Sequence, residues 1–123
     1  MTWSDEQLSA FAQANDFHVA PYRADGKTLG TPTYIWSVVT DGGLFIRAYS
    51  GQGSSWYQAA LSQKEGQIEL TGETFDVAFE PVASEALNDR IDEAYKSKYA
   101  DSSYLTPMIS DRARGATVQV KPR

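Results

Sequence analysis

The stretch YIWSVVTDGGLFIRAY, residues 34–49, decides the fold class of this 123-residue chain. Its first half, residues 34–40, is rich in β-branched and aromatic residues on both alternating sets, which is typical of a strand in a barrel or of one buried on both faces. Asp41 and Gly42 can take the two positive-φ positions of a type I′ turn. Residues 44–49 then form the return strand, so the stretch predicts an antiparallel hairpin.

Working outward from this hairpin, helical spacing and capping residues predict about three helices, and alternating patterns predict four more strands. Six short, mainly antiparallel strands can close into a small barrel, which removes exposed sheet edges. We therefore expect one α+β domain over residues 1–123. The expected helices are residues 5–15 with Ser4 as cap and Gln7 completing a capping box, 56–64 ended by Gly66, and 85–99 capped by Ser84; the further strands are residues 17–20, 67–71, 74–81 (after a turn at Gly72-Glu73) and 116–122.

The composition excludes several functional classes. The chain has no cysteine, which excludes disulfides, thiol catalysis and cysteine zinc sites, and its single histidine, His18, argues against a histidine metal centre. A net charge of −5 argues against nucleic acid as a partner. No apolar run is long enough to span a membrane, and the first residues do not resemble a signal peptide. We therefore expect a cytoplasmic protein without a metal.

Residues 51–55, GQGSS, form an unusual strand-to-helix turn with two interpretations. Glycines allow a ligand to approach the backbone closely, and a helix N-terminus with serine hydroxyls can bind an anion such as a phosphate. Alternatively, Ser55 only caps the following helix, with Gln58 completing a capping box. The turn has neither the third glycine of a dinucleotide fingerprint nor the lysine of a P-loop.

Arg47 also has two interpretations, because it lies in the middle of a strand on the same face as Phe45 and Tyr49. Its guanidinium could bind a phosphate or carboxylate as a fork. Alternatively, Arg47 faces solvent and pairs across the strands with an acid such as Glu69.

Three further groups leave function open. Residues 95–115 either line the mouth of a pocket or form a polar connector with solvated arginines; the candidates for the pocket mouth are Ser102, Ser103, Tyr104, Arg112 and Arg114. The many aromatic residues, Trp36 among them, either stack on a planar heterocycle or belong to the core. No spacing of carboxylates identifies a catalytic pair, so the catalytic residues are not assigned.

Several segments together resemble a family of small bacterial proteins known as domain of unknown function 2255. These are TWS near the start, PTYIW, LFIRAYSGQGSSWYQAA, FEPV, AYKSKY and SYLTPMIS followed by AR. The resemblance covers nearly the whole chain, from Thr2 to Arg123, and it implies no known activity.

A looser resemblance connects the chain with the split β-barrel flavin and deazaflavin oxidoreductases, the nitroreductase-like relatives of pyridoxamine phosphate oxidase. It is carried by the two glycines of the turn and by the Trp-Tyr pair that opens the helix. It implies a split barrel, a homodimer with a small-molecule ligand at the subunit interface, and FMN or a deazaflavin as cofactor. The residues that would bind the cofactor are Arg47, Gly51, Gly53, Ser54, Ser55 and Trp56.

One residue departs from this pattern. Gln52 stands where many of the flavin proteins have a basic residue, which removes a charge-assisted contact to a phosphate. The sequence is therefore also consistent with a dimeric binding or structural module that keeps the barrel without a redox cofactor.

Overall fold

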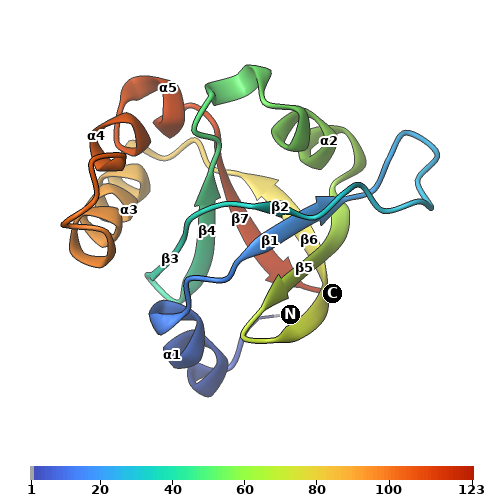
Figure 1. Ribbon diagram of the computed structural model, residues 1–123, viewed down its shortest axis with the longest axis horizontal. Coiled ribbons are helices and arrows are strands. Elements are labelled where there is room, and N and C mark those ends of the chain that lie inside the picture. Colours follow the sequence, from blue (N-terminus) through green and yellow to red (C-terminus); the bar gives the residue numbers. More distant parts are fainter. Residues whose placement is uncertain (1) are drawn as a thin grey trace.

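The computed structural model describes residues 2–123, which form a seven-stranded antiparallel sheet with helices packed around it (Figure 1). The sheet order is β2-β1-β5-β6-β7-β4-β3. The two edge strands, β2 and β3, belong to one continuous segment, so the sheet curls until this segment supplies both edges. The α+β class and the small split barrel are thereby confirmed. The strands are β1 (His18–Pro21), β2 (Thr33–Tyr34), β3 (Ser37–Thr40), β4 (Gly43–Arg47), β5 (Glu65–Leu70), β6 (Glu73–Pro81) and β7 (Thr117–Pro122).

The barrel is split where the expected strand 34–40 breaks in two. Its first part, β2, pairs with β1, and its second part, β3, pairs with β4. Ile35 and Trp36 lie between the two parts, and only the Ile35 amide still donates to a neighbour, the carbonyl of Phe17 at 3.1 Å. The break coincides with the change of partner, because β2 pairs only with β1 and β3 pairs only with β4. Seven strands are therefore the six expected ones with one divided.

Both tight hairpins have turn residues in the left-handed region. Asp41 and Gly42 have φ values of 53° and 73°, which confirms the turn between β3 and β4. Between β5 and β6 the corresponding residues are Thr71 and Gly72, with φ values of 55° and 76°, and not Gly72 and Glu73 as expected. The pairing of Leu70 with Glu73 requires this shift by one residue.

The three long helices start where the sequence predicts, within one residue. Ser4 and Gln7 form the expected capping box, and the Ser84 hydroxyl accepts from the Leu87 amide. No helix within residues 2–123 is long and apolar enough to cross a membrane. The helices are α1 (Asp5–Gln13), α2 (Ser55–Gln63), α3 (Glu85–Lys98), and the one-turn α4 (Leu105–Met108) and α5 (Asp111–Arg114), with a 3₁₀ turn η1 (Gly51–Gly53) before α2.

The expected end of α2 at Gly66 is wrong. Lys64 ends the helix in the left-handed conformation with φ 64°, and Gly66 lies inside β5. Gly66 serves a different purpose, because a Cβ there would lie 2.5 Å from the carbonyl oxygen of Ala20 in β1. The residue permits the close approach of two strands.

Two apolar clusters lie on the two faces of the sheet. One fills the inside of the barrel and includes Leu44 and Ile46. The other, between the outer face and α3 and α4, includes Phe45 and Tyr95. Because side chains alternate along β4, Arg47 faces outward with Phe45, toward the group of helices α3, α4 and α5 on one side of the sheet (Figure 1).

Candidate functional site

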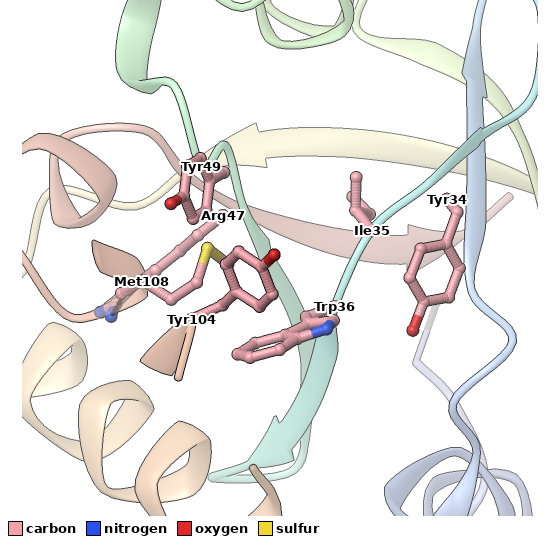
Figure 2. Close-up of a pocket in the computed structure, with 7 residues that line it drawn as sticks. All are labelled: Tyr34, Ile35, Trp36, Arg47, Tyr49, Tyr104 and Met108. Atoms are coloured by element: carbon pink, nitrogen blue, oxygen red, sulfur yellow. Dashed lines mark hydrogen bonds between the residues drawn. The ribbon is translucent and has the colours of Figure 1, made fainter. Parts of the chain in front are cut away.

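An apolar cavity of about 430 Å³ lies at the split between β2 and β3 (Figure 2). Three segments line it: the break in the edge segment, the end of β4, and the region around α4. Three tyrosines at its rim remain 45–62 % exposed. The cavity, called here the split cavity, is lined by Tyr34, Ile35, Trp36, Arg47, Tyr49, Tyr104 and Met108.

The aromatic walls of the split cavity are held by their own packing. Trp36 stacks on Tyr99 of α3, with ring centroids 3.9 Å apart and planes 2° from parallel. Tyr49 and Tyr104 meet edge to face at 6.2 Å across the rim. Such pairs fix the orientations of the rings before a ligand arrives. The binding of a flat ligand would therefore cost little conformational entropy of these aromatic side chains.

Arg47 contributes to the wall of the cavity, but its guanidinium is turned away toward the helices (Figure 2). It is completely buried, and all five of its N–H groups donate to protein atoms. Nε donates to the Thr117 hydroxyl at 2.9 Å, Nη1 to Asp92 and to the Met108 carbonyl, and Nη2 to the side-chain and backbone oxygens of Asn88. The interpretation of Arg47 as a solvent-facing partner of Glu69 is therefore wrong.

Arg114 extends this buried network. Its Nη1 lies 2.5 Å from the second carboxylate oxygen of Asp92, so that Asp92 bridges two arginines. Arg114 also pairs with Glu85 and Asp89 of α3, and its side chain is only 15 % exposed. The interpretation of Arg114 as a solvated residue of a connector is wrong, because the network ties α5 to α3 and, through Arg47, to the sheet.

The glycine-rich turn packs against α5. Gly51 has φ 79°, and a Cβ on it would lie 2.5 Å from Cγ of Arg112. Gln52 donates from Nε2 to the Gly115 carbonyl at 2.9 Å. The turn thus has a structural role at the junction of η1 and α5.

The predicted cap of α2 is shifted by one residue. Ser54, and not Ser55, is the N-cap, and it makes no side-chain cap hydrogen bond. Gln58 donates to the Gln52 carbonyl instead of completing a capping box. The interpretation of the turn as a capping box on Ser55 is therefore wrong, and the first amides of α2 receive no side-chain cap.

The structure separates most of the predicted cofactor residues from the split cavity. Trp56 is 8 % exposed and packs edge to face against Tyr57 in the core inside the barrel. Of the six predicted residues, Arg47 alone appears among those that line the cavity. Trp36, which the sequence also offers as a residue that could stack on a planar ligand, forms a wall of it.

Arg112 is the basic residue at the rim. Its guanidinium carbon lies 5.6 Å from the centroid of the Tyr49 ring, while its Cγ packs over Gly51. Within residues 2–123 no carboxylate lies within 4.0 Å of it, in contrast to Arg114 on the same short helix. The side chain is exposed, so its donors remain accessible to an anion at the cavity mouth.

Residues 7–120 match the family described as "Uncharacterized protein conserved in bacteria (DUF2255)". The chain belongs to this family. The resemblance carried by the segments around LFIRAYSGQGSSWYQAA is thus confirmed, and the DUF2255 description assigns no activity. No curated protein matches the chain. Among residues 2–123, no group of three or more His, Asp or Glu side chains is arranged to hold a metal ion.

Proposed function

We propose that this DUF2255 protein binds a planar aromatic small molecule in the split cavity, and that a flavin or deazaflavin used in an oxidoreductase is the class of ligand to test first. The observation that carries the proposal is the aromatic lining of the cavity. Its volume of about 430 Å³ lies in the range of small-molecule sites, roughly 300–1,000 Å³. Stacking on preoriented rings favours a flat ligand over a flexible aliphatic one.

The residues fit the two halves of a flavin nucleotide unequally. The ring system is matched by Trp36, Tyr49 and Tyr104. The phosphate finds no free donor on Arg47, because all five N–H groups are already used. Arg112 at the rim is the cation that remains accessible. When bound, a flavin would supply the hydride chemistry, and the protein would contribute binding and orientation.

We expect riboflavin and FMN to bind the protein with micromolar dissociation constants, measured by flavin fluorescence or calorimetry. Tyr104→Ala should weaken both about two- to tenfold, because an aromatic contact of this kind contributes roughly 0.5–1.5 kcal/mol. Tyr22→Ala is the matched control, since Tyr22 lies outside the cavity lining and its loss should leave affinity unchanged. Absence of binding by either flavin, and by a deazaflavin, at about 100 μM would refute the proposal for this class.

The same titrations distinguish the contribution of the flavin ring to affinity from the contribution of the phosphate. Arg112→Gln should weaken FMN binding about tenfold and leave riboflavin binding unchanged, because charge-assisted hydrogen bonds act only on the phosphate. Equal losses for both ligands would show that Arg112 acts through packing on Tyr49 and not through charge.

A second candidate is a dimeric module without a redox cofactor, favoured by the three half-exposed tyrosines at the rim. A second copy that covers Tyr34, Tyr49 and Tyr104 would remove this aromatic surface from water. We expect a molar mass of twice 13.6 kDa by light scattering after size-exclusion chromatography. Tyr104→Glu should then shift the mass toward the monomer. A wild-type monomer at about 100 μM would contradict the dimer.

A further inference from the structure

A second cavity, called here the lysine cavity, lies where the end of α3 meets β3 and the end of α1. Its volume is about 560 Å³. Val38 and Val39 of β3 give it apolar walls, and polar side chains, among them Gln13, Asn15 and Ser97, surround the rest. Tyr99 separates it from the split cavity, because one face of its ring stacks on Trp36.

Lys98 is one of the residues that line this cavity. Nζ donates to the Ser37 carbonyl at 2.8 Å and lies 5.4 Å from the centroid of the Tyr99 ring. The Tyr99 hydroxyl donates to the same carbonyl at 3.2 Å. Within residues 2–123 no carboxylate lies within 4.0 Å of the amine, whereas the exposed Lys96, two residues earlier, pairs with Glu93.

Partial burial makes the charged form of Lys98 less favourable than it is for an exposed lysine. Burial lowers the pKa of Lys98 to about 8, and the charge of Asp16 raises it only in part. Asp16 lies between α1 and β1, and its carboxylate accepts from the amides of Thr71 and Gly72. The other titratable neighbour, Tyr99, stays protonated because burial raises its pKa to about 12. Lys98 is therefore expected to lose its proton at a lower pH than an ordinary lysine, whose pKa is about 10.4.

We propose that Lys98 is a nucleophilic amine that condenses with a small polar aldehyde bound in the lysine cavity. Nζ forms a bond to the carbonyl carbon, the carbonyl oxygen leaves as water with both amine hydrogens, and an imine remains. The imine takes up one proton from solvent, and its single N–H donates to the Ser37 carbonyl, as Nζ does now. The side chains of Gln13, Asn15 and Ser97 supply hydrogen bonds for the hydroxyl groups of the aldehyde.

The test is reductive trapping with glycolaldehyde and cyanoborohydride between pH 6 and 9.5, read by peptide mass spectrometry. We expect Lys98 to be labelled at least about tenfold faster than Lys96 at pH 7.4, with a midpoint near pH 8. Lys96 is an internal control on the same helix and in the same sample, so folding and reagent concentration are identical for both. Equal rates with the same pH dependence overturn the proposal.

A second comparison distinguishes the effect of the cavity lining on aldehyde binding from the intrinsic reactivity of the amine. Gln13→Ala combined with Asn15→Ala should slow glycolaldehyde labelling of Lys98 several-fold and leave acetylation by acetic anhydride unchanged, because the anhydride reports only the neutral amine. Fast acetylation of wild-type Lys98 without preferential aldehyde labelling would overturn the proposed carbonyl site. The experiment does not depend on the split cavity or on any flavin.

Discussion

Arg47→Met is expected to lower the free energy of unfolding by about 3–5 kcal/mol, the usual cost of breaking a buried ion pair by removing one partner. Methionine keeps the aliphatic stem but supplies no donor. The Thr117 hydroxyl then loses the Nε donor, Asn88 Oδ1 keeps only its bond from the Thr117 hydroxyl, and Asp92 keeps only Arg114. For a domain of this size the loss corresponds to a fall in melting temperature of about 10–20 °C.

The matched control is Arg90→Met. Arg90 also pairs with an aspartate, Asp41, but their side chains are 51 % and 36 % exposed. An exposed pair contributes roughly 0–1 kcal/mol, so this variant should unfold close to the wild type. Both variants are compared by urea denaturation at pH 7. Equal effects of Arg47→Met and Arg90→Met would show that the buried network does not stabilise the fold.

Gly66→Ala is expected to destabilise the protein by about 3 kcal/mol or more, because the added methyl group meets rigid backbone. Its Cβ would lie 2.5 Å from the Ala20 carbonyl oxygen and 2.6 Å from Cα of Pro21. Neither atom can rotate away, so β1 must separate from β5 or the backbone must distort. Because β1 also pairs with β2, which contributes Tyr34 to the split cavity, the separation would disturb that cavity. Circular dichroism during urea unfolding measures the effect.

Gly53→Ala provides the control for this substitution. Nothing lies within 4 Å of a Cβ at Gly53, and its φ is not in the left-handed region. Its effect should remain within about 0.5 kcal/mol. A Gly66→Ala variant as stable as Gly53→Ala would contradict the close approach of β1 and β5.

The features that could be predicted from sequence are those set by neighbours along the chain. The turn at Asp41-Gly42 follows from the φ preference of those two residues, and the cap at Ser4 follows from a side chain three residues away. The end of α2 was missed because a glycine usually marks a helix end, whereas Lys64 took the left-handed position. Gly66 was needed for a contact with β1, which is distant in sequence.

The candidate site was predicted only in part for the same reason. Trp36 lines the split cavity because the edge segment must change partners at residues 35–36, and this depends on the order of the whole sheet. Tyr104, suggested at a pocket mouth, does line the cavity. Whether Arg47 and the turn at Gly51 hold a cofactor stays a prediction, although Arg47 has no unused donor.

The sequence by itself determined the α+β class, the hairpins, the long helices and the family, because periodicity, turn preference and capping act over a few residues. The tertiary structure decided which polar groups are used within the protein and which remain accessible. Arg47 bonds with Asn88 and Thr117, which are 41 and 70 residues away, and these partners meet only after β4 pairs with β7 and α3 packs on the sheet. The alternation along β4 places an arginine on the outer face of the sheet, but long-range packing determines whether that arginine binds a ligand or holds the helices.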